Sequence, residues 1–306
     1  MSRNKAFSVI NILGLALGLT SSLFIFLWVK DEYNMDKFNI HSSQLYDIYE
    51  RIFTGGKIQT LRFTPGVMAA EMKRVFPQIQ YASGFTDGTL FGAQNTFRAG
   101  DKVIKENGGA ADSDFFKMFN YPLLEGNAAS ALNEPGDIAI SQSMADQLFG
   151  NPVNAINKLI QMNDQTGFRV SAVFKLPENS SDKFNYLINW YAFLNDQSNM
   201  KSWNNTGVST YIMLKDGADP AIFQKEITGF LKKYAEFSGD YHVELGLQHF
   251  DKMYLYSHFS SAGYPDGGRI EYVRLFSIIA ILILLIACIN FMNLTTARSS
   301  KRAKEV

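Results

Sequence analysis

The residue types that most often carry chemistry are few in this chain, and their spacing matches no known site. The histidines form no HExxH motif and no other metal-ligand pattern; they are His41, His242, His249 and His258. The single cysteine, Cys288, lies inside a long apolar run, which excludes a Cys/His zinc site. The sequence also lacks a GxSxG nucleophile elbow and a GxxxxGK(S/T) phosphate-binding loop. We therefore expect a chain that is not an enzyme, with no catalytic residues, metal or cofactor of its own.

Three carboxylates, Asp112, Asp114 and Asp137, are the candidates for a cation site. Helix caps and turns account for carboxylates in such positions far more often than metal binding does. We therefore interpret all three as structural residues.

Composition excludes nucleic acid as a partner. The 306 residues carry 29 basic and 29 acidic side chains, whereas a surface that follows phosphates needs a basic excess. Hydrophobic residues make up 46% of the chain, an ordinary value that hides an uneven distribution. With one cysteine no internal disulfide forms, so a folded domain must be held together by its core.

Two long runs, residues 9–29 and 275–294, contain no charge, and each holds thirteen residues of Val, Ile, Leu or Phe. A helix of about 20 residues rises roughly 30 Å, the thickness of the hydrocarbon layer of a bilayer. A buried core helix is the alternative for either run. A cleaved signal peptide is the alternative for the first, but that run exceeds the roughly 7–15 apolar residues of a signal peptide, and no cleavage site follows. Two transmembrane helices in contact with membrane lipid are the better interpretation.

Basic residues predict the orientation of these helices, because Lys and Arg are enriched on the cytoplasmic side. Arg3 and Lys5 precede the first run, and a basic flank follows the second: Arg298, Lys301, Arg302 and Lys304. We expect residues 1–8 and 295–306 to be cytoplasmic and residues 30–271 to be extracytoplasmic. The protein is then a multi-pass protein of the cytoplasmic (inner) membrane with a large periplasmic domain.

Small residues form a stripe in the first run, where Gly14, Gly18 and Ser22 recur at intervals of four. Such a stripe lets another helix approach closely, so we expect helix packing there. In the second run, Asn290 and Asn293 lie one turn apart. Two readings stay open for them: a bond across helices, or a position at the membrane interface.

The segment between the runs alternates strand and helix patterns, which predicts an α+β domain of two subdomains. Expected strands cover 45–53, 138–140, 168–174, 211–214 and 243–248. One helix is expected to be capped by Thr64-Pro65, with the stripe Met68, Met72, Val75 and Phe76. Others are expected at 112–119, capped by Asp112 or Ser113, at 142–149, between Ser141 and Gly150, and after Asp219-Pro220, with the stripe Phe223, Ile227, Phe230, Leu231 and Tyr234.

Several segments carry a family resemblance. The stretches GGAADSDFFKMFNYPLLEG (108–126), DIAISQSMADQLFGNPVN (137–154) and FRVSAVF (168–174) resemble the periplasmic core domain of MacB-like ABC transporter permeases. RNKAFSVINILGLALGL (3–19) and the stretch 269–306 resemble the first two transmembrane helices of FtsX-like permeases. Residues 80–107 and 175–205 match no family pattern.

The resemblance implies the fold, the function and the partners. The family has four membrane helices, with the large domain after the first, so we expect this chain to be a fragment. It implies one subdomain from 40–85 and 205–258, with 86–204 inserted as the other. It further implies a permease subunit that forms a homodimer or pseudo-dimer and docks a separate ABC ATP-binding subunit, which alone binds ATP. The permease couples ATP hydrolysis to extracytoplasmic change, as export or mechanotransmission, and the sequence does not choose a substrate.

A two-span sensor receptor with an extracytoplasmic ligand-binding domain is the alternative, because its architecture is the same. A sensor continues into a signalling segment, whereas a permease continues into further apolar runs.

The predicted topology is testable by labelling. Single cysteines introduced at Gly88 and at Ser300 should react with membrane-impermeant reagents from opposite sides of the membrane, because the Lys/Arg bias places the loop outside. Labelling of both positions from one side would contradict the orientation.

Overall fold

The structure is a computed structural model that describes residues 2–92 and 94–302, with side chains described outside 2–8, 166, 294–295 and 297–302. It divides into two compact units. One contains the chain up to Asn34, Leu255–Ser257 and the chain from Gly267 onward; the other contains Met35–Tyr254 and His258–Asp266.

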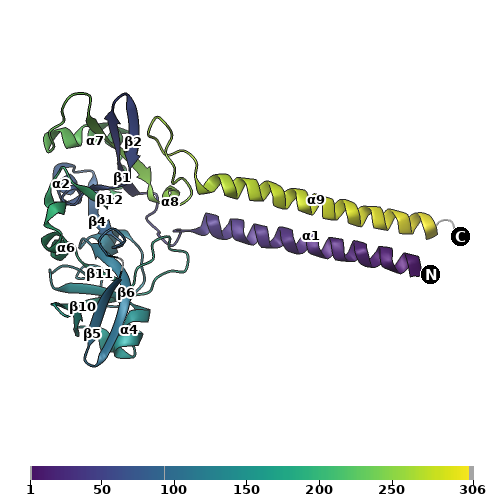
Figure 1. Cartoon of the computed structure of the whole chain (residues 1–306), viewed down its shortest axis with the longest axis horizontal. Helices are drawn as coiled ribbons and strands as arrows, with labels where there is room; N and C mark the ends of the chain where they lie inside the picture. The colour runs from purple at the N-terminus through teal and green to yellow at the C-terminus, as the bar shows by residue number, and fades with distance from the viewer. Residues whose placement is uncertain (1, 93, 303–306) are drawn as a thin grey trace. The chain divides into compact units, whose positions relative to one another are not determined.

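The first unit is built on two long helices, α1 (Ser2–Asn34) and α9 (Arg269–Arg302), which Figure 1 shows running side by side. Within them, Val9–Asn34 and Arg269–Asn293 are long and apolar enough to cross a membrane. Many of their large side chains are exposed, among them Leu17, Phe24 and Ile286. A helix with apolar side chains on all its outer faces suits a lipid environment. Both expected apolar runs lie inside these helices.

In the described part of the second unit, thirteen strands form one mixed sheet. They are β1 (Leu45–Thr54), β2 (Lys57–Leu61), β3 (Thr64–Pro65), β4 (Ile79–Thr86), β5 (Gln94–Ala99), β6 (Lys102–Ala111), β7 (Leu123–Glu125), β8 (Asp137–Ser141), β9 (Leu159–Met162), β10 (Thr166–Phe174), β11 (Tyr186–Asn189), β12 (Thr206–Leu214) and β13 (His242–His249). Short helices join them: α2 (Met68–Val75), α3 (Phe115–Met118), α4 (Gln142–Phe149), α5 (Pro152–Ala155), α6 (Trp190–Asp196), α7 (Pro220–Ile227) and α8 (Phe250–Met253), with 3₁₀ turns η1 (Ser198–Lys201) and η2 (Phe230–Lys233). The α+β class is confirmed.

Six of these strands close into a barrel. Strand β6 pairs with β5 through residues 102–107 and with β11 through 108–111. The remaining pairs, β11 with β8, β8 with β10, β10 with β9, and β9 with β5, complete the ring. Alternate residues point inward, so Ile138 and Ile140 join the core inside the ring while Ala139, between them, joins a different core. We call this ring the barrel.

The barrel continues into an open antiparallel sheet through β4, which pairs with the end of β6. From there the order is β4, β12, β1 and β13. Helices α2 and α7 cover this sheet, and the core between them contains Met68, Met72, Phe223 and Ile227. The six barrel strands, and β7 which pairs with β10, come from residues 94–189, and the strands of the open sheet come from the remainder. The division into two subdomains at the expected boundaries stays a prediction.

The local capping signals had mixed outcomes. Ser141 caps α4 by accepting a hydrogen bond from the Met144 amide, and Gly150 ends that helix with a φ of 87°, as expected. Asp219 caps α7, also as expected. The expected cap at Thr64-Pro65 is wrong. These residues form β3, and the Thr64 hydroxyl contacts the Val208 carbonyl and the Thr210 hydroxyl instead.

Two other helices differ from the expectation. Helix α3 begins only at Phe115, and Asp112 bonds the adjacent Ser113 amide rather than capping the helix. The helix after Asp219 ends at Ile227, and the stripe continues through the 3₁₀ turn η2, so Phe230 and Leu231 are buried nonetheless. In both segments the apolar side chains must be buried, and an α-helix and a 3₁₀ turn can each bury them.

Burial of the stripe is testable on α7 and η2. A Phe230→Asp change should lower the free energy of unfolding by at least about 3 kcal/mol, because it replaces a core ring that is 2% exposed with a charge. Thermal unfolding of the chain measures this. Ile222→Asp, at an exposed position in the first turn of α7, is the matched control and should leave the melting temperature nearly unchanged. Equal effects of the two changes would contradict the assignment.

Candidate functional site

The small residues of α1 face α9. A Cβ on Gly18 would lie only 2.8 Å from the Cβ of Ala287, so the two backbones approach as closely as glycine permits. A Cβ on Gly14 would lie 3.4 Å from the Asn290 amide nitrogen. Ser22, 2% exposed, donates from its hydroxyl to the Ala280 carbonyl at 3.1 Å. We call this line of contacts the seam. A role of the same residues in a dimer stays a prediction.

Polar contacts close the seam at both ends. The Asn290 amide donates to the Asn11 carbonyl at 3.3 Å, whereas Asn293 is exposed and makes no bond to α1 among the described residues. At the other end, the Arg269 guanidinium donates to both oxygens of Glu32 at 2.5 and 3.1 Å, and Glu32 is 6% exposed. Such forked pairs are among the stronger charged contacts. Sequence reasoning missed this pair, because charges of both signs flank each apolar run and nothing in the sequence singles out Glu32 and Arg269.

The basic flank expected after the second run is only partly described. The backbone of Arg298, Lys301 and Arg302 lies in α9. Their side chains, and the whole of Lys304, lie outside the described residues.

The candidate cation ligands are held by neighbouring groups. Asp114 accepts from Lys73 and from Lys117, and Asp137 accepts from Arg169 at 2.7 Å. Burial raises the pKa of Asp112, against its hydrogen bonds from Ser113. Among residues 2–92 and 94–302, no three His, Cys, Asp or Glu side chains are grouped so that they hold a metal ion.

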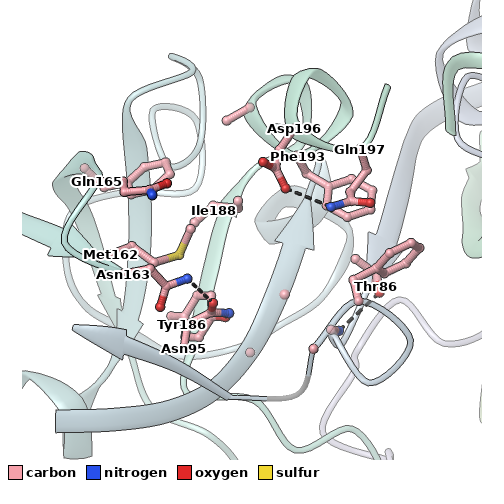
Figure 2. Close-up of a pocket in the computed structure, with 17 residues that line it drawn as sticks. Thr86, Asn95, Met162, Asn163, Gln165, Tyr186, Ile188, Phe193, Asp196 and Gln197 are labelled. Atoms are coloured by element: carbon pink, nitrogen blue, oxygen red, sulfur yellow. Dashed lines mark hydrogen bonds between the residues drawn. The ribbon is translucent and has the colours of Figure 1, made fainter. Parts of the chain in front are cut away.

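A pocket of about 270 Å³ opens at the mouth of the barrel (Figure 2). It lies where β4 ends and β5 begins, beside Gly108 and Gly109 of β6. Glycine is required at both positions. A Cβ on Gly109 would lie 1.8 Å from the Thr86 carbonyl oxygen, and one on Gly108 would lie 2.3 Å from that of Tyr186.

A hydrogen-bonded group braces one wall of the pocket. Asn163 donates to Asn95 at 2.6 Å, and Asn95 donates to the Tyr186 hydroxyl at 2.5 Å. Burial raises the pKa of Tyr186, and the bond from Asn95 partly offsets that shift. Across the pocket, Gln197 donates to Asp196 at 2.8 Å (Figure 2). None of these residues was predicted, because they come from segments distant in sequence that only the closure of the barrel brings together.

The comparisons with known proteins agree with this architecture. Residues 8–230 match the model of the MacB-like periplasmic core domain. The chain belongs to this family. The resemblance to MacB/FtsX-type permeases is thereby confirmed, and the domain is the periplasmic domain of an ABC-type membrane transporter permease, flanked by two candidate transmembrane helices.

Three solved structures are similar to this MacB-like chain, and the first of them has a similar fold. A domain of a protein assigned as a permease from Porphyromonas gingivalis has 16% identity and a TM-score of 0.57, covering 77% of this chain and 98% of that one. The periplasmic region of MacB from Actinobacillus actinomycetemcomitans has 16% identity and a TM-score of 0.45, covering 66% and 88%. The extracellular domain of the noncanonic ABC-type transporter YknZ from Gram-positive bacteria has 13% identity and a TM-score of 0.44, covering 65% and 98%. No curated protein matches the chain.

The seam is testable by crosslinking in the membrane. In a Cys288→Ser background, cysteines at Asn11 and Asn290 should form a disulfide efficiently, because these residues contact across the seam. Adding Gly18→Leu should reduce the crosslinked fraction several-fold while membrane insertion stays intact, since no side chain fits against Ala287. Ala16→Leu, at an exposed position of α1, is the control. An unchanged yield with Gly18→Leu would show that the helices do not pack at this point.

Proposed function

We propose that this chain is a permease subunit that couples ATP hydrolysis on a separate ATP-binding subunit to a conformational change of its periplasmic domain. The change serves either export or mechanotransmission. In this proposal the N-terminal end of α1 and the C-terminal end of α9 are cytoplasmic, and the permease works as a homodimer or pseudo-dimer. Membership of the MacB-like family supports this function over a two-span sensor receptor.

The 306 residues contain no phosphate-binding loop, so in this proposal ATP is bound outside them, on a separate subunit. Between that partner and the periplasmic domain lies roughly 30 Å of hydrocarbon, where irregular backbone exposed to lipid is not tolerated. The signal must therefore pass through helices.

The pairing of α1 with α9 carries the proposal. Helix α9 contains neither Pro nor Gly from Arg269 to Arg302, so the residue types that most often kink a helix are absent from it. Helix α1 contains Gly14 and Gly18, but there it packs against α9. The Glu32–Arg269 pair then fixes the two helices to each other at the end where the chain enters and leaves the periplasmic domain. A displacement of one helix along the seam is thus transmitted to the other.

Charge reversal tests the coupling. Glu32→Arg or Arg269→Glu alone places like charges together and should uncouple the complex: the partner still hydrolyses ATP, but the periplasmic domains no longer respond. The double change restores an opposite-charge pair and should recover the response. The readout is the ATP-dependent change in distance between spin labels at Gly100 in two copies, measured by electron paramagnetic resonance alongside ATPase rates.

Asp31→Arg, at the exposed neighbouring position, is the matched control and should leave coupling intact. Unaided ATP hydrolysis by the purified chain would contradict the proposal, as would an intact response in both single variants.

A further inference from the structure

The pocket at the barrel mouth exists because one strand is interrupted. Strands β4 and β5 pair with the same strand, β6: Thr86 lies opposite Ala110, and Gln94 lies opposite Asn107. The chain between them leaves the sheet beside Gly108 and Gly109, where the Thr86 and Tyr186 carbonyls approach too closely for any side chain. Barrel mouths are common positions for small-molecule sites, since the surrounding strands fix the walls.

The floor of the pocket is apolar. It includes Met162, Phe168, Ile188 and Phe193, the last three being 2%, 8% and 6% exposed. Figure 2 shows Met162 and Ile188 directed toward the centre of the cavity.

The rim is polar and rich in amides. Gln165 and Asp196 are exposed on opposite sides of the rim, and Gln197 lies beside Asp196 (Figure 2). Thr86 adds a hydroxyl that accepts from the Gly88 amide at 3.1 Å. Among the described lining residues none is Lys, Arg or His, so nothing there neutralises an anionic ligand.

The rim groups retain hydrogen-bonding capacity toward a ligand. In the described part of the chain the Gln165 side chain makes no hydrogen bond, so its amide offers both donors and an acceptor. Asp196 uses one carboxylate oxygen for Gln197, which leaves the other, and Gln197 retains its own carbonyl oxygen. The Thr86 hydroxyl retains its proton for donation.

We propose that this pocket binds one uncharged sugar unit of an extracytoplasmic glycan. A pyranose ring has an apolar C–H face and a rim of hydroxyl groups, each both donor and acceptor. That pattern is complementary to an apolar, partly aromatic floor beneath amide and carboxylate side chains. Phosphate and carboxylate ligands are disfavoured, because no Lys, Arg or His is among the described lining residues. A peptide strand needs an unpaired sheet edge or a groove open at both ends, whereas the strands around this pocket are paired in a closed ring.

Ligand-observed saturation-transfer NMR on the 306-residue chain in lipid nanodiscs tests the proposal; sugar-based detergents are avoided because they would compete. The probes are free N-acetylglucosamine, glucose and galactose, with triglycine and inorganic phosphate as comparison ligands. At least one sugar should bind saturably, and the comparison ligands should not. Asp196→Ala with Gln197→Ala should raise the Kd of that sugar about tenfold or more through lost hydrogen bonds.

Ala192→Leu tests the location independently, because it fills the pocket from α6 without introducing charge and should abolish binding with little change in melting temperature. Asp146→Ala removes an exposed carboxylate from α4 on the same barrel and is the matched control. The proposal is overturned if no sugar binds, if triglycine or phosphate binds instead, or if pocket variants and the control bind alike. Because binding needs no ATP-binding partner, its failure leaves the proposed coupling function untouched.

Discussion

The hydrocarbon layer imposes the constraint on which the rest of this protein depends. A helix satisfies its backbone groups within its own segment, and among the described helices α1 and α9 are long and apolar enough to cross this layer. Lipid tails supply no hydrophobic force that holds two apolar helices together. Association must then come from close backbone approach, which Gly18 and Ala287 allow, and from polar bonds such as that of Ser22 with the Ala280 carbonyl. The seam combines both.

In the second unit the corresponding constraint is strand pairing. Strand β6 is the only described strand that belongs to both the barrel and the open sheet, because it pairs with β5, β11 and β4 along its length. Its glycines at 108 and 109 are required by the close approach of Thr86 and Tyr186. The same two residues line the pocket. One local sequence feature thus permits the close strand approach beside which the cavity opens.

Sequence reasoning succeeded where the deciding physics is local. Ser141 and Gly150 cap and end α4 through bonds within one turn, and charge-free length reveals an apolar helix without reference to the rest of the fold. It failed where a distant partner decides. Thr64 was expected to cap a helix, yet β12 supplies the partners that hold it in a strand. The pocket was invisible for the same reason, since Asn95, Asn163 and Tyr186 meet only after β11 joins β6 in parallel.

The Glu32–Arg269 pair shows how a partner distant in sequence can offset the unfavourable electrostatic energy of a charge in its own helix. Glu32 lies in the last turn of α1 and Arg269 begins α9, so each charge opposes the dipole of its own helix. At exposed sites such placements cost about 0.3–1 kcal/mol each. Each residue is unfavourable at its position in its own helix. Glu32 is also buried, which makes an unpaired carboxylate there still less favourable. Each charge is tolerated because the other helix presents its complement.

The Glu32–Arg269 pair therefore opposes separation of the helices at this end more strongly than a surface ion pair would, since opening it leaves two charges that are each unfavourable in their own helix. Helix ends held in this way move together, which is the property that transmission along α1 and α9 requires.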